Sequence, residues 1–138
     1  MTPNIQKKKV RKVKFNIMEP VFNNAISCYL GYSWQEVLKE VEKHQSDLLP
    51  ELKKCTDMDI TPGLYLEASK PNGDRFKILF ARDIDLPLIA HELVHACIRS
   101  HRYRGLELNE GSEEAYAYYY EFMWREILSN LSVTVNTK

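Results

Sequence analysis

Alternating apolar and polar positions mark three short stretches of the chain as strands. Residues 13–17 alternate in this way, as expected for a strand with one buried and one solvated face. Residues 64–68 show the same alternation, and the apolar run 76–80 follows soon after. Pro71-Asn72-Gly73-Asp74 lies between these two stretches and has strong turn chemistry. The sequence therefore predicts a β-hairpin over residues 64–80.

Apolar residues at helical spacing predict three longer elements. The first follows Ser33-Trp34-Gln35-Glu36, which has the form of a capping box. The second covers roughly residues 86–98, with carboxylates before it and Pro87 near its start. The third runs from about Glu110 to Leu128, and residues 20–31 are expected to form an approach helix or a turn. These elements indicate an α+β fold, with a small, mostly antiparallel sheet packed on two or three helices.

Length and composition are those of one ordinary globular domain. The chain has 138 residues, of which 44% are hydrophobic and 28% charged, so we expect a single domain over residues 1–138. No apolar run approaches membrane-spanning length, and no secretory signal is recognisable at the N-terminus. A cytoplasmic location without membrane contact is the resulting expectation. The three cysteines are an odd number without paired spacing, so we expect reduced and mostly buried thiols.

Residues 1–14 form a basic segment in a chain whose net charge is zero. Six of the positions 7–14 are lysine or arginine. A basic arm of this kind could be flexible and touch nucleic acid or acidic partners. The alternation over residues 13–17 favours a strand with a solvated face instead, and no nucleic-acid-binding motif accompanies the charges. A nucleic-acid partner is therefore not expected.

The segment His91-Glu92-Leu93-Val94-His95 carries the main chemical signal. Positions i and i+4 of a helix lie about 5–6 Å apart at Cβ, so the two imidazoles can bind one metal ion. Glu92 projects beside the pair, where it can accept a proton from a water molecule. This combination is typical of zinc hydrolases, with His91 and His95 as ligands and Glu92 as general base. The other interpretation is an amphipathic helix with ordinary histidines.

A catalytic zinc site needs a third protein ligand, and a family resemblance indicates one. Eighteen residues separate His95 from Glu114, which begins Glu114-Ala115-Tyr116-Ala117. This pattern of HExxH, eighteen residues and ExxA resembles the gluzincin group of zinc metallopeptidases. In size and in these two motifs the chain also resembles small metallopeptidases encoded by bacteriophages. The resemblance spans about residues 76–124, and it implies a zincin-like fold, a Zn²⁺ cofactor and Glu114 as the third ligand.

Other third ligands remain open at this point. Glu113 and Glu110 are neighbouring candidates, ranked after Glu114. His101 lies six residues after His95, the spacing at which metzincin proteases place a third histidine. That family has glycine where this chain has Ile98, and an unbroken helix would point His101 about 240° away from His95.

The function implied is hydrolysis of a peptide bond in a protein or peptide substrate. Tyr118 lies one turn beyond Glu114, and its hydroxyl could hydrogen-bond a metal ligand or the oxyanion. The predicted hairpin could hold an extended substrate by main-chain hydrogen bonds. The alternative function is a binding or regulatory protein that contains zinc and hydrolyses nothing.

Overall fold

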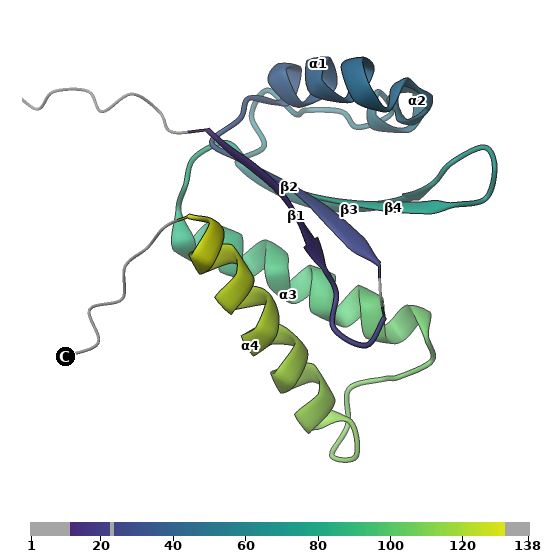
Figure 1. The fold of residues 1–138 in the computed structure, drawn as a ribbon, viewed down its shortest axis with the longest axis vertical. Helices are drawn as coiled ribbons and strands as arrows, with labels where there is room; N and C mark the ends of the chain where they lie inside the picture. The colour runs from purple at the N-terminus through teal and green to yellow at the C-terminus, as the bar shows by residue number, and fades with distance from the viewer. Residues whose placement is uncertain (1–11, 23, 132–138) are drawn as a thin grey trace, which may run out of the picture.

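The computed structural model describes residues 12–22 and 24–131, and it has an α+β architecture (Figure 1). One sheet contains four strands in the order β1-β2-β4-β3. The described elements are β1 (Val13–Met18), β2 (Ala25–Leu30), α1 (Trp34–His44), the 3₁₀ helix η1 (Ser46–Leu48), α2 (Leu49–Leu52), β3 (Gly63–Ser69), β4 (Arg75–Ala81), α3 (Leu86–Tyr103) and α4 (Glu113–Asn130).

Helices cover both faces of the sheet. Figure 1 shows α1 and α2 on one face and α3 with α4 on the other. Each face has its own apolar core. Ile26, Cys28 and Leu79 belong to the core shared with α3 and α4, whereas Tyr29 and Phe80 belong to the core beneath α1. The α3–α4 layer is therefore held against the sheet by a continuous buried interface.

The sheet is mixed, because one of its three pairings is parallel. β1 pairs with β2 and β3 pairs with β4 in antiparallel fashion, as expected for a mostly antiparallel sheet and for the predicted hairpin. β2 and β4 run parallel. The expected helix or turn over residues 20–31 is wrong, since Ala25–Leu30 is the inner strand β2. An inner strand covered on both faces is nearly continuously apolar and lacks the alternation that identifies a half-exposed strand.

Local capping chemistry determines where the helices begin. Ser33 Oγ accepts a hydrogen bond from the Glu36 N–H at 3.1 Å, and Glu36 Oε1 accepts from the Ser33 N–H at 2.9 Å, which confirms the capping box. α3 begins after Asp85 with Pro87 in its first turn, as predicted. α4 begins at Glu113, three residues later than expected. The Asn109 side-chain oxygen accepts hydrogen bonds from the N–H groups of Gly111 and Ser112. These bonds hold residues 109–112 in a turn, so the helix begins after it.

The described end of the basic segment contacts α1. Lys12 forms an ion pair with Glu36, and Lys14 Nζ lies 3.5 Å from Glu40 Oε2. These two lysines occupy the exposed side of the β1 region, which agrees with the solvated-strand interpretation. The predicted basic arm over residues 1–11 lies outside the described residues. Within residues 12–22 and 24–131, no helix has the length and apolar character needed to cross a membrane.

The three cysteines are free thiols, and two of them are buried. Burial raises the pKa of Cys28, and burial with the nearby Glu19 carboxylate raises the pKa of Cys97 to about 12. Only thiolates react quickly with alkylating reagents. We expect iodoacetamide at pH 8 to label the half-buried Cys55 in the native protein, and Cys28 and Cys97 only after denaturation. Mass spectrometry of labelled peptides would check this, and equal labelling of all three native thiols would contradict it.

Candidate metal centre

Helix α3 brings two imidazoles and one carboxylate together. The rings of His91 and His95 have centroids 5.0 Å apart and are inclined by 77°. A ligand atom from each ring and one from Glu92 lie within 4.8 Å of one another, so this group could hold a metal ion. Regular i, i+4 spacing on an unbroken helix is the cause of the arrangement. The predicted convergence of these three residues is thus present in the structure.

The carboxylate of Glu92 is buried and incompletely hydrogen-bonded. Only 6% of the residue is exposed, and its Oε2 has no hydrogen-bond partner among the described residues. A buried carboxylate oxygen without a partner is energetically costly, and it is expected where a cation or a bound water completes the site. Imidazole and carboxylate are common zinc ligands, so the donor set fits such an ion.

The face of α3 that carries this group is turned towards strand β3. Leu88 contacts β3, since a Cβ added to Gly63 would lie 3.2 Å from its Cδ1. Eleven residues later, Arg99 donates a hydrogen bond to the Tyr65 carbonyl at 3.2 Å. Glu92 and His95 lie between these two contacts at helical spacing. The metal-binding group therefore lies alongside β3, which is an edge strand of the sheet.

The free edge of β3 presents main-chain groups at alternate residues. The Arg82 N–H donates to the Pro62 carbonyl, and the Lys70 N–H donates to the Asp74 carbonyl. Hydrogen-bonded pairs alternate along an antiparallel ladder, so the even-numbered residues of β3 bond to β4. The N–H and C=O groups of Gly63, Tyr65 and Glu67 consequently point away from β4. The Arg99 contact to the Tyr65 carbonyl agrees with this assignment.

Glu114 is not part of the metal-binding group in this arrangement. It is exposed in the first turn of α4. The Cys97 thiol donates to the Tyr116 carbonyl, and the His101 ring stacks on Tyr116 at 4.0 Å, so this turn lies beside the end of α3. His95 is six residues before His101, which is about 9 Å along the helix. Glu114 as third ligand would require the start of α4 to move towards the two imidazoles.

The other candidate ligands also lie outside the group. Glu110 and Glu113 are exposed near the start of α4. His101 is 2% exposed, and its Nδ1 lies 2.7 Å from the Cys97 carbonyl oxygen. α3 continues unbroken through Ile98 to Tyr103, so His101 is directed at α4. None of these residues joins His91, Glu92 and His95 within the described part of the chain.

Tyr118 lies on a different surface from the metal-binding group. It is 58% exposed and lines a small, largely apolar pocket together with residues of the β1–β2 turn, Val21 and Phe22. The neighbouring Tyr119, which sequence reasoning did not single out, is buried with 2% exposure. The proposed catalytic contact of Tyr118 has no support in this arrangement of α4.

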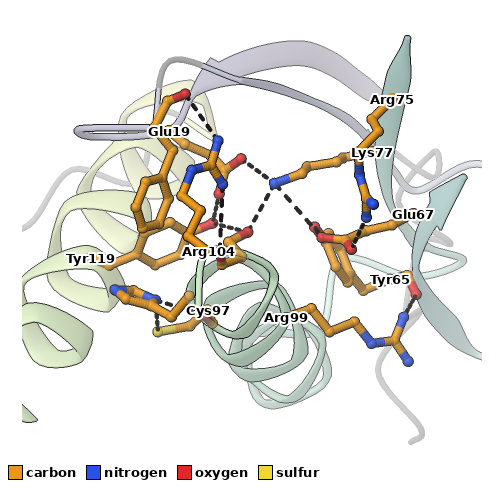
Figure 2. Close-up of polar contacts among 12 residues, drawn as sticks. Glu19, Tyr65, Glu67, Arg75, Lys77, Cys97, Arg99, Arg104 and Tyr119 are labelled. Carbon is orange, nitrogen blue, oxygen red and sulfur yellow. Dashed lines mark hydrogen bonds and ion pairs between the residues drawn. The ribbon is translucent and has the colours of Figure 1, made fainter. Parts of the chain in front are cut away.

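A buried polar cluster, which the sequence analysis did not identify, fixes α3 against the sheet (Figure 2). Lys77 Nζ on β4 donates to Glu19 Oε1 at 2.5 Å and to Ser100 Oγ on α3 at 3.0 Å. The Tyr119 hydroxyl donates to Glu19 Oε2 at 2.5 Å. Burial and the Glu19 carboxylate raise the pKa of Tyr119, so it remains a donor at neutral pH. These contacts position the helix that carries the metal-binding group.

Comparisons with protein-family models, with curated proteins and with solved structures returned no match to this chain. The geometry of the site is therefore the basis for a functional proposal.

Proposed function

We propose that this protein is a zinc-dependent hydrolase of peptide bonds. The observation that carries the proposal is the group formed by His91, Glu92 and His95, in which a buried carboxylate oxygen has no hydrogen-bond partner among the described residues. Two imidazoles with a carboxylate beside them are the residue types that metal-assisted hydrolysis requires. The exposed position of His91 leaves this group accessible from solvent.

His91 and His95 would hold the ion, and Glu92 would move protons. A bound zinc ion would supply Lewis-acid chemistry at the scissile carbonyl. Glu92 would accept a proton from the attacking water and donate it to the leaving amine. Burial of its side chain restricts the rotamers of Glu92, which favours a fixed position for proton transfer.

Strand β3 would bind the substrate in an extended conformation. Its outward N–H groups at Gly63, Tyr65 and Glu67, with the C=O groups of Gly63 and Glu67, offer the hydrogen bonds that an added strand uses. Such bonds do not depend on the substrate sequence. Because β3 runs beside the face of α3 that carries Glu92 and His95, a peptide on this edge would pass close to the metal centre.

The direct test of the metal centre is a zinc titration of ligand variants. His91→Ala and His95→Ala should each weaken zinc binding by more than about 100-fold, because removing a direct ligand costs more than removing a supporting contact. Competition with a chromophoric chelator would measure the affinities. Wild-type affinity in either variant would contradict the proposed centre.

Glu114 remains our predicted third ligand, and the same titration tests it. Glu114→Ala should lower zinc affinity sharply, which would require α4 to shift when the metal binds. His101→Ala is the comparison variant and should leave the affinity unchanged, because its ring is buried against Tyr116. An unchanged affinity in Glu114→Ala would remove this residue from the ligand set.

The second candidate function is a zinc-containing binding protein without catalysis. One observation favours it: with Glu92 assigned to proton transfer, the group leaves two protein ligands among the described residues, one fewer than a catalytic zinc site normally has. The residues outside the described part include no histidine, cysteine, aspartate or glutamate. In a binding protein, the replacement of Glu92 would change no reaction, so a hydrolysis assay separates the two candidates.

A further inference from the structure

Arg99 is an exposed cation on the same ridge of α3 as the metal-binding group. It follows His95 by four residues, and Glu92 precedes it by seven, so the three side chains lie on one side of the helix. Helical side chains lean towards the N-terminus of their helix, which brings the long arginine side chain back towards the turn of His95. The guanidinium therefore lies on the side of α3 that faces the free edge of β3, where it reaches the Tyr65 carbonyl.

The guanidinium of Arg99 is held in place but not neutralised. One of its nitrogens donates to the Tyr65 carbonyl at 3.2 Å, and its Cζ lies 5.7 Å from the centroid of the Tyr65 ring (Figure 2). A guanidinium has five N–H donors, so most of them remain available. Among residues 12–22 and 24–131, no carboxylate forms an ion pair with Arg99.

The carboxylate that β3 itself carries is already engaged. Glu67 accepts a hydrogen bond from the Tyr65 hydroxyl at 2.6 Å and from Arg75 at 2.8 Å. Lys77 Nζ lies 3.7 Å from the same carboxylate. Glu67 is thus fully used by its own neighbours, and Arg99 remains a positive charge without an ion-pair partner among the described residues at the edge of β3.

The geometry points to Arg99 as the residue that binds a carboxylate of the substrate, and this inference rests on the proposed function. Arginine binds carboxylates through two parallel hydrogen bonds, and its donors here are held at the strand edge. Four helical residues advance about 6 Å, and alternate residues of an extended peptide are about 7 Å apart. The carboxylate would therefore lie about two residues from the scissile bond, as an acidic side chain or as the chain terminus.

Peptide binding to a variant that cannot hydrolyse its ligand tests this inference. We would use the full chain with Glu92→Gln, loaded with zinc, and fluorescein-labelled alanine hexapeptides. Three probes carry one glutamate with an amidated C-terminus, glutamine at the same position with an amidated C-terminus, or glutamine with a free C-terminus. Fluorescence anisotropy should show about tenfold or tighter binding of one carboxylate-bearing probe over the neutral probe. The probe that gains affinity identifies whether side chain or terminus supplies the carboxylate.

Variants of Arg99 assign the preference to this residue. Arg99→Gln, added to the Glu92→Gln chain, should abolish the preference, and Arg99→Lys should retain part of it, because lysine keeps the charge but loses the two-point contact. Arg102→Gln is the matched control on the same helix. Arg102 lies by the α3–α4 loop with Glu107, so its replacement should leave the preference intact. Thermal unfolding of each variant would verify its fold.

Several outcomes would overturn the inference. Equal binding of all three probes by the Glu92→Gln chain would show that no carboxylate is recognised. A preference that survives Arg99→Gln would show that another residue recognises the carboxylate. If zinc-loaded wild-type protein cleaves none of the peptides although the Arg99-dependent preference is present, the carboxylate site stands and the proposed hydrolysis fails for these ligands.

Discussion

Glu92→Gln is expected to lower the rate of peptide hydrolysis by about 10²–10⁴-fold, the range that general acid–base catalysis contributes. Glutamine has nearly the same shape as glutamate but cannot accept a proton from water. Because Glu92 lies buried within the metal-binding group, no other carboxylate of the described residues can take its place there. The measurement is kcat/KM on a peptide substrate that zinc-loaded wild-type protein has first been shown to cleave.

The same variant should keep its zinc and its fold. We expect zinc affinity to change little, because His91 and His95 remain and Glu92 is assigned to proton transfer. Glu121→Gln is the matched control, since this exposed carboxylate on α4 forms an ion pair with Arg125 on the protein surface. Hydrolysis by Glu92→Gln at the wild-type rate would refute Glu92 as general base. Loss of zinc from this variant would instead make Glu92 a metal ligand.

Features of the metal centre that depend on neighbouring residues could be predicted from the sequence. His91, Glu92 and His95 converge because one helical turn separates them, and a regular helix needs no information from elsewhere in the chain. The capping box at Ser33 and the β3–β4 hairpin are local in the same sense. Each was predicted correctly from a few consecutive residues.

Features that depend on the packing of distant segments could not be predicted. The position of Glu114 relative to His95 depends on how α4 is placed along α3, and a count of intervening residues does not contain this information. The parallel pairing of β2 with β4 likewise joins segments about fifty residues apart. Sequence spacing also failed to identify Tyr119 as a buried tyrosine beside Tyr116, because four tyrosines occur within residues 116–120.

The buried pair Glu19–Lys77 is a further case in which no local pattern gives a signal. The two residues are 58 positions apart, so no short sequence pattern relates them. Figure 2 shows them at the centre of a cluster that also includes Tyr119, Glu67 and Arg75. The cluster connects the end of β1, strand β4 and both helices of one layer. Its contribution to stability depends on the burial of these charged groups, which the sequence alone does not show.

Lys77→Met is expected to destabilise the protein by about 3–5 kcal/mol, because it leaves a buried carboxylate without its cation. The side chains of Lys77 and Glu19 are 2% and 0% exposed, so water cannot replace the lost contact. Ser100 on α3 would lose its donor as well. Urea denaturation, with the slope of the transition compared between variants, would measure the free energy of unfolding.

Tyr119→Phe is the milder variant for the case in which Lys77→Met does not fold. It removes one hydrogen bond to Glu19 and should cost about 1–3 kcal/mol.

Arg125→Met is the matched surface control: its ion pair with Glu121 is largely exposed, and its loss should cost no more than about 1 kcal/mol. The double variant Glu19→Leu with Lys77→Met should be more stable than Lys77→Met alone, because no uncompensated charge remains buried. If both Lys77→Met and Tyr119→Phe were as stable as Arg125→Met, the cluster would not hold α3 and α4 against the sheet.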